Sequence, residues 1–259
     1  MLAALQYLVL EAVTGAAWHH PAYNYAVNFI SDLGNPVPGD VFDGRIIDSP
    51  LHLVMDTAFI AQGTLFIAAA VLLYRVAGGR LRGALLALAI LHGTGVIMVG
   101  LFHESSAALH NGVIIAHSIG ALLAIVPGNV IAIIAGPAGR RLGLPAWYRI
   151  LSVTLGIAGL AAFVLLQADH PLYVAAGGVP ERIAVYTILA WEAVTGLGTV
   201  LSLSRSRGAA PLAARHEELP RMTRATPPAR LAGRCALATG SMSGSAGPSP
   251  GPRAAESQD

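Results

Sequence analysis

The sequence has little charge, no lysine and a single cysteine. Charged residues make up 12% of its 259 residues, whereas a soluble domain usually contains about 25%. Because Cys235 is the only cysteine, an intramolecular disulfide and a thiolate metal cage are both excluded. The net charge is only +2 and the arginines are spread over loops and tail, which gives no basic surface for DNA or RNA. We therefore expect no metal, no cofactor and no nucleic-acid partner.

Small and aliphatic residues dominate the chain. Hydrophobic residues make up 54% of it but aromatic residues only 6%, and the mean hydropathy is +0.62. Six apolar stretches are each long enough to cross a hydrocarbon core, which takes roughly 17–25 helical residues. They cover residues 2–18, 51–74, 83–102, 110–135, 148–168 and 183–204. We therefore predict an all-α integral membrane protein, a six-helix transmembrane bundle in residues 1–204, with membrane lipids as its surroundings.

The arginines are distributed unequally between the two sides of this predicted bundle. The connections after the second, fourth and sixth stretches hold nine of them: Arg75, Arg80, Arg82, Arg140, Arg141, Arg149, Arg205, Arg207 and Arg215. The opposite connections hold only Arg45 and Arg182. Since loops rich in Lys and Arg stay in the cytoplasm, both termini are predicted to be cytoplasmic, in the cell membrane of a bacterium. Residues 19–50, 103–109 and 169–182 are then outside.

The C-terminal segment, residues 205–259, differs from the rest in composition. It consists largely of Arg, Pro, Ala, Gly and Ser, with few large apolar side chains. Such a segment cannot bury enough surface to offset the entropy lost on ordering. We predict a disordered, basic cytoplasmic tail.

Polar residues inside the predicted helices are candidates for function, because ionisable groups are costly within a membrane. Glu11, His92, Asn129 and Glu192 are of this kind. Asn129 follows Pro127 and Gly128, a combination typical of a helix kink with an amide available to a neighbouring helix.

A second group of candidates lies toward the predicted outer surface: Ser31, Asp32, Asp56, His117, Glu181 and Arg182. Ser31 and Asp32 place a hydroxyl beside a carboxylate, although Ser, Asp and Gly34 in this order are also typical of a turn. His52 and Asp56 are four residues apart and share a helix face, which suits either a proton shuttle or an ordinary helix end. Arg182 must pair with a carboxylate if it lies at the membrane edge. The partners we expect are the adjacent Glu181 or, alternatively, Asp32, Glu104 or Asp169.

Several motifs in order resemble the bacterial and archaeal membrane family named domain of unknown function 998. They are YNYAVNFISDLG, SP, LFHES, AHSIGALLAIVPGNVIAIIAG and GGVPERIAVYTILAWEAVTG, and the resemblance spans residues 5–204. It implies a multi-pass fold and marks Ser31, Asp32, Leu33, Gly34, His117, Asn129, Glu181, Arg182 and Tyr186. The chain departs from the family pattern at Asn24, where serine is common, and at His103, where proline is usual. The resemblance implies no activity.

Three classes of function remain open from the sequence. The first is transport or small-ligand binding at the outward-facing polar site, with Glu11, His92, His117 and Glu192 marking a polar path. The second is a non-catalytic scaffold or accessory subunit, in which the polar residues hold helices together. The third is a membrane-embedded enzyme acting on a lipid or envelope precursor, with Ser31, Asp32 and His117 as nucleophile or acid–base groups.

Overall fold

The computed structural model describes residues 1–76, 79–142, 144–168 and 176–218. The chain divides into two compact units, Met1–Gly208 and Ala209–Asp259. The first unit contains the helices of the membrane part. In the second unit, the described residues continue the last helix as far as Glu218.

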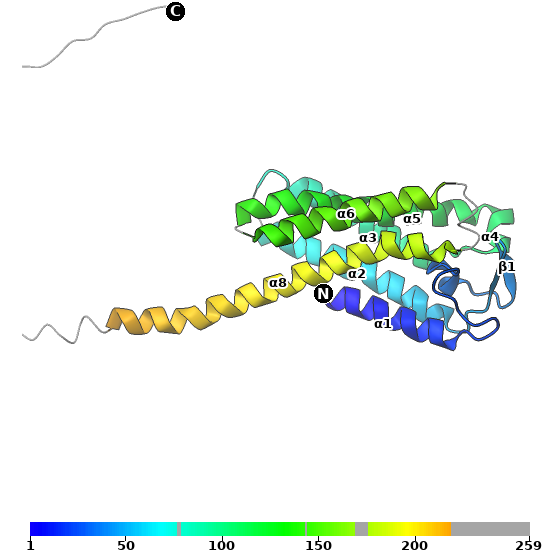
Figure 1. The fold of residues 1–259 in the computed structure, drawn as a ribbon, viewed down its shortest axis with the longest axis horizontal. Coiled ribbons are helices and arrows are strands. Elements are labelled where there is room, and N and C mark those ends of the chain that lie inside the picture. Colours follow the sequence, from blue (N-terminus) through cyan, green and yellow to red (C-terminus); the bar gives the residue numbers. More distant parts are fainter. Residues whose placement is uncertain (77–78, 143, 169–175, 219–259) are drawn as a thin grey trace, which may run out of the picture. The chain divides into compact units, whose positions relative to one another are not determined.

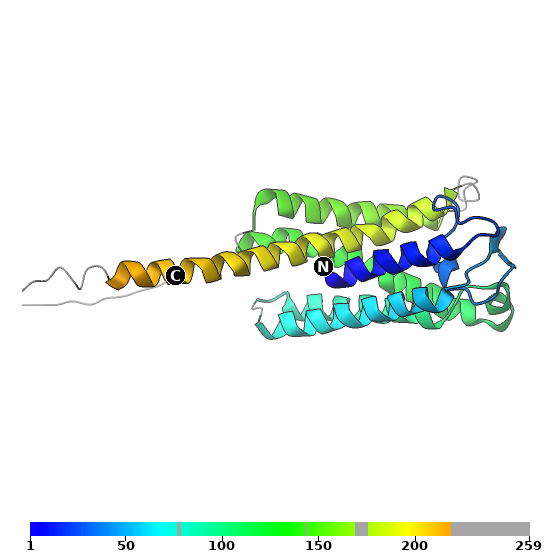
Figure 2. The same ribbon diagram turned by 90° about the horizontal axis from the view of Figure 1, so that it is seen from below.

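The first unit is a bundle of helices capped at one end by the first connection (Figures 1 and 2). The α-helices are α1 (Leu2–Ala17), α2 (His52–Val76), α3 (Arg82–Leu101), α4 (Ser106–Asn111), α5 (Val113–Ala138), α6 (Ala146–Leu166) and α8 (Gly178–Glu218). The first connection contains the 3₁₀ helix η1 (Ser31–Gly34) and a hairpin of β1 (Asp40–Phe42) and β2 (Arg45–Ile47), and η2 (Gly139–Leu142) follows α5.

Five of the described helices are long and apolar enough to cross a membrane. These spans are His52–Arg75, Arg82–Leu101, Val113–Ala138, Ala146–Leu166 and Gly178–Val200. They confirm the prediction of a helical membrane protein, although the first connection also contains the unpredicted hairpin. Helix α1 has only 16 residues, just under the usual length of a span, so the sixth span stays a prediction. Helix α8 continues past the predicted boundary at 204, and residues 219–259 of the predicted tail lie outside the described residues.

Helix α8 is bonded to four other helices of the bundle. Its polar contacts are Tyr186 with Glu11 of α1, Glu192 with Gln62 of α2, Ala184 O with Asn129 of α5, and Thr195 with Tyr148 of α6. The remaining helices pack in chain order, with α2 on α3, α3 on α5 and α5 on α6, while α1 lies against α2. Helix α8 therefore joins the first helices of the bundle, α1 and α2, to the later helices α5 and α6.

Glycines bring the backbones of neighbouring helices into contact, as the composition predicts for helices in lipid. A Cβ built on Gly63 of α2 would lie 2.3 Å from the carbonyl oxygen of Gly93 of α3. A Cβ on Gly95 of α3 would lie 2.3 Å from the amide nitrogen of Ala124 of α5. At both crossings any larger residue must push two helices apart.

The hairpin in the first connection places Arg45. Its strands are joined by Asp43 and Gly44, which have φ values of 47° and 75°, the positive values that a two-residue hairpin turn requires. Strand alternation then turns Phe42 and Arg45 inward while Val41 faces out. The hairpin is fixed to the bundle because Asp40 accepts hydrogen bonds from both the amide and the hydroxyl of Ser106, at the start of α4.

We predict that Gly95→Ala lowers the melting temperature of the purified protein in detergent. The added methyl group meets the backbone of α5, and overpacking of this kind typically costs about 1–3 kcal/mol. Gly83 lies on the same helix with nothing within 4 Å of a built Cβ, so Gly83→Ala is the matched control and should leave the melting temperature unchanged or raise it. Equal melting temperatures for the two variants would contradict the close contact between α3 and α5.

Candidate functional site

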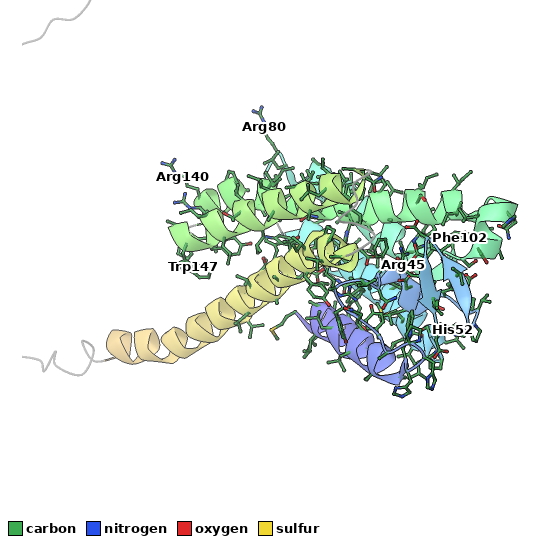
Figure 3. The ribbon with its side chains drawn as sticks, turned by 45° about the vertical axis from the view of Figure 1, so that its right-hand side comes forward. Arg45, His52, Arg80, Phe102, Arg140 and Trp147 are labelled. Atoms are coloured by element: carbon green, nitrogen blue, oxygen red, sulfur yellow. The ribbon has the colours of Figure 1, made fainter. Side chains whose placement is uncertain are left out.

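Buried polar residues gather at the end of the bundle that carries the first connection. Figure 3 shows Arg45, His52 and Phe102 at this end, whereas Arg80 and Arg140 lie at the opposite end. The elements that meet here are the C-terminal end of α1, η1, β2, the segment between α3 and α4, and the start of α8. We call this end the cap end.

The ion pair between Asp32 and Arg45 is the centre of the cap end. The Asp32 carboxylate accepts hydrogen bonds from Nε and Nη2 of Arg45 at 2.9 and 3.1 Å, and the Asp32 side chain is fully buried. The guanidinium also lies 3.9 Å from the centre of the Phe29 ring. Burial would lower the pKa of Arg45, but the hydrogen bonds and charge of Asp32 outweigh it and raise that pKa. Arg45 therefore stays charged despite its burial.

Glu104, between α3 and α4, lies beside this pair. Its Oε1 accepts a hydrogen bond from the Ser31 hydroxyl at 2.8 Å and lies 3.6 Å from Nη2 of Arg45. Its Oε2 is 3.6 Å from Nε2 of His117. Burial and the nearby charge of Asp32 raise the pKa of Glu104 well above its usual range, although Arg45 opposes the shift. Glu104 thus favours its protonated form more than an exposed glutamate does.

Glu181, in the first turn of α8, holds the start of η1. Its carboxylate accepts hydrogen bonds from the amides of Ile30 and Ser31 and from the Ser31 hydroxyl, the last two at 3.3 and 3.2 Å. Ser31 therefore stands between Glu104 and Glu181, within hydrogen-bond reach of both. A single hydroxyl hydrogen cannot satisfy two ionised carboxylates, so this arrangement suits one ionised and one protonated partner.

Arg182 makes a separate set of contacts. Its Nη1 donates to the carbonyl oxygens of Tyr25 and Asn28 at 2.7 Å each and to that of Gly178 at 3.1 Å. Its Nη2 donates to the hydroxyl of Tyr23, and its Nε is 3.4 Å from Oε1 of Glu11. Arg182 thus pairs with Glu11, rather than with the Asp32 or Glu104 that the sequence suggested as partners, and Asp169 lies outside the described residues.

Carboxyl groups outnumber guanidinium groups in this buried cluster. Glu11, Asp32, Glu104 and Glu181 are each 9% exposed or less, and so are Arg45 and Arg182. Four ionised carboxylates beside two cations would leave two uncompensated negative charges away from water, which costs several kcal/mol for each ion. The cluster must therefore hold protons or attract a cation.

Asp56 belongs to a separate pair at the same end of the bundle. Its Oδ2 is 3.1 Å from Nε2 of His103, whereas His52, one turn away on the same helix, contacts the carbonyl oxygen of Ser49 instead. The pairing of His52 with Asp56 that the helix spacing suggested is therefore wrong. Among the described residues, no three or more His, Cys, Asp or Glu side chains form a group suited to a metal ion.

A cavity of about 60 Å³ lies directly beneath the cluster. Its walls come from α1, α2, α3, α5 and α8 and are mainly apolar, and its polar lining residues are Ser31, Gln62, His92, His117 and Glu181. A much wider hollow of about 760 Å³ lies on the other side of the Asp32–Arg45 pair, lined by Arg45 together with residues such as Asn28 and Phe29. Arg45 thus lines the hollow, and its partner Asp32 adjoins in sequence the cavity residue Ser31.

The structure brings together most of the predicted site but gives its members different partners. Ser31, Asp32, His117 and Glu181 meet through Glu104 and Arg45, the two site residues that sequence reasoning did not select. Both could have been found, because Arg45 is the only arginine in the long first connection and Glu104 the only acid in residues 103–109.

The intramembrane candidates lie below the cap end. Asn129 of α5 donates hydrogen bonds to the carbonyl oxygens of Ile125 and Ala184, each at 3.0 Å, and accepts one from Thr187. Its amide therefore joins α5 to α8. His92 lines the cavity together with Gln62, and Gln62 donates a hydrogen bond to Glu192 at 2.6 Å.

These features define a multi-pass helical membrane protein with a buried ionic cluster at one end. A family model described as protein of unknown function (DUF998) matches residues 1–198. The chain belongs to this family, as the order of its motifs indicated. Comparison with curated proteins and with solved structures found no match.

We predict that Asp32→Asn destabilises the protein strongly. The substitution leaves Arg45 buried without its charged partner, and breaking a buried ion pair on one side costs about 3–5 kcal/mol. Asp43 contacts the same arginine at 3.1 Å but its side chain is 77% exposed, so Asp43→Asn is the control and should cost less than about 1 kcal/mol. Thermal and denaturant unfolding in detergent measure both. A similar loss in the two variants would contradict the importance of the buried pair.

Glu104 should make stability depend on pH. Because its pKa is higher in the folded protein than in the unfolded chain, its contribution is fully present in acid and is lost as pH rises through the folded-state value. We therefore expect the melting temperature of the wild type to fall with increasing pH above about 4.3, the ordinary pKa of Glu. Glu104→Gln keeps a neutral side chain at this position and should make that fall smaller. An unchanged pH profile in Glu104→Gln would contradict the assignment.

Proposed function

We propose that this protein binds a small solute at the cap end and that binding is linked to protonation of the buried carboxyl cluster, as in a transport-type membrane protein. The observation that carries the proposal is the excess of buried carboxyl groups over guanidinium groups directly above a cavity. A solute with a positive charge, or a proton taken up together with a polar solute, would supply the missing compensation.

The cap end faces outward in this proposal. Arg80 and Arg140 lie at the other end of the bundle (Figure 3), and the positive-inside rule favours the cytoplasm for that end. We also propose that α1, although short, is the sixth span in a cell-membrane protein with both termini inside. A short hydrophobic helix is accommodated by local thinning of the bilayer at modest cost.

The wide hollow supports access from outside. It is lined by Arg45, whose partner Asp32 is the sequence neighbour of the cavity residue Ser31. A solute entering the hollow would therefore meet the Arg45 guanidinium first. Neutralising Asp32 or moving Arg45 would open a route to Ser31 and Glu181, which line the cavity.

A scaffold function is the second candidate, and Arg182 is the observation that favours it. Its three backbone acceptors, the Tyr23 hydroxyl and Glu11 tie the first connection to α8 and α1. An enzyme with Ser31 as nucleophile has less support. The Ser31 hydroxyl contacts Glu104 and Glu181, whereas His117 contacts the Phe102 carbonyl through Nδ1 and Glu104 through Nε2. His117 is thus not placed as the base for Ser31.

We predict that solute addition to reconstituted protein produces transient currents on a solid-supported membrane, and that these currents depend on pH. The panel should contain small amines, amino acids and neutral polar solutes, each added at acidic and alkaline pH. Glu181→Gln removes a buried charge at the cavity. Since a hydrogen bond to a charged group contributes about 1.5–3 kcal/mol, apparent affinity should fall about 10- to 100-fold.

Asp48→Asn is the control for this experiment, because Asp48 lies in the same connection and accepts a hydrogen bond from the His20 amide but lines neither the hollow nor the cavity. It should retain the currents and their pH dependence. A protein that is folded by its melting curve but gives no current with any member of the panel would favour the scaffold candidate.

A further inference from the structure

The inner cavity follows one face of α8 toward Glu192. Glu181, Val185, Ile188 and Leu189 of this helix line it, and these positions recur at helical spacing. Glu192 is the next residue on the same face. It is buried and bonded to Gln62, which also lines the cavity. One carboxyl group, that of Glu181, therefore lines the cavity, and a second, that of Glu192, is bonded to the lining residue Gln62.

Two polar atoms at the inner end of the cavity have no partner. His92 is 3% exposed, and its Nδ1 faces the carbonyl oxygen of Ala124. Because a carbonyl oxygen only accepts, Nδ1 carries the hydrogen, and in the neutral ring Nε2 is an acceptor. Within the described part of the chain, Nε2 has no hydrogen-bond partner, and neither has Oε1 of Gln62, whose amide nitrogen donates to Glu192.

Water is the partner that fits these atoms. Buried acceptors are rarely left unsatisfied, since each costs about 1–3 kcal/mol. A cavity needs only about 10–15 Å³ to hold a water, so the volume of about 60 Å³ accommodates several. Water molecules there could donate to both Nε2 of His92 and Oε1 of Gln62 while contacting Ser31 and Glu181 at the outer end.

We propose that water in this cavity connects Glu181 to Glu192 past His92 and Gln62, and that a proton taken up at the cap end reaches Glu192 by this path. The proton leaves the carboxyl group of Glu181, passes through water and the Nε2 lone pair of His92, and ends on the carboxylate of Glu192. Eleven residues of helix separate the two carboxyl groups along α8, about 16 Å. The inference rests on the proposed function and names the proton as its coupled ion.

Other ionisable groups surround the two ends of this path. Around Glu181 they are Asp32, Arg182, Glu104, Arg45 and His117, with Tyr7 on the α1 wall of the cavity. Around Glu192 the charged neighbour is the amino group of Met1, which lies near Gly196 on the next turn of α8. The outer end of the path therefore has several acidic neighbours, whereas the amino group of Met1 lies near its inner end.

The test is the charge displaced by a pH step in reconstituted protein on a solid-supported membrane, with no solute present. Protons that stop at the cap end move a short distance into the membrane, whereas protons that reach Glu192 move about 16 Å further. We expect Glu192→Gln to reduce the displaced charge at least twofold and His92→Phe to slow the displacement. His110 is exposed on α4, so His110→Phe is the matched control and should behave as the wild type.

A second variant tests the cavity itself without removing an ionisable group. Ala121 of α5 lines the cavity, and Ala121→Leu places three further carbon atoms where the water would be. It should reduce the displaced charge as Glu192→Gln does. Ala161→Leu makes the same change at an exposed position of α6 and should have no effect.

Infrared difference spectra across the same pH step show which carboxyl group takes up the proton. A protonated-carboxyl band that disappears in Glu192→Gln supports the path. Unchanged charge displacement in both Glu192→Gln and Ala121→Leu overturns it, as does a band that persists in Glu192→Gln. If the path is overturned in this way but solute-induced currents persist in Glu192→Gln and Ala121→Leu, the proposed binding at the cap end still holds. Loss of the solute-induced currents in Glu181→Gln alone bears only on binding at the cap end.

Discussion

The cap end depends on the buried ion pair between Asp32 and Arg45. Asp32 lies in η1 and Arg45 in β2, so their two hydrogen bonds close the first connection onto itself over the ends of the helices. This closure sets the Ser31 hydroxyl between Glu104 and Glu181. A buried charge needs its partner, so this contact fixes η1 against β2, while Asp40, Glu181 and Arg182 attach the connection to the helices.

The same pair explains why the cluster is sensitive to protons. Arg45 is strongly held by Asp32 and only more distantly by Glu104, at 3.6 Å. Glu104 therefore lacks a full counter-charge and favours its protonated form. In that form it can donate a hydrogen bond, and its ionisation would add a negative charge beside Asp32. Any change in protonation at Glu104 must alter the hydrogen bonds of Ser31, and through Ser31 those of Glu181.

The helices could be predicted from the sequence because the hydrocarbon core imposes a minimum apolar length, which composition alone reveals. The ends of α2, α3 and α6 agree with the predicted stretches to within about two residues. Helix α8 was less predictable, because its polar end carries no hydrophobic signal. The hairpin was missed as well, although Asp43-Gly44 is a strong turn dipeptide. Its strands have three residues each, too few for an alternation to be recognised.

The sequence indicated which polar residues lie at this end of the bundle but not how their side chains pair. The asymmetry of the arginines gives only the depth of Ser31, Asp32, Glu181 and Arg182 along the bundle axis. Pairing also depends on the direction in which each side chain points from its helix. Arg182 pairs with Glu11, which is 171 positions earlier in the sequence. As a result the two buried arginines have different roles. Arg182 donates to backbone carbonyls of the first connection and joins it to α8, and it also lines a second hollow of about 490 Å³. Arg45 lines the wider hollow and pairs with Asp32, the sequence neighbour of the cavity residue Ser31, so a solute that displaces Arg45 acts directly beside the cavity.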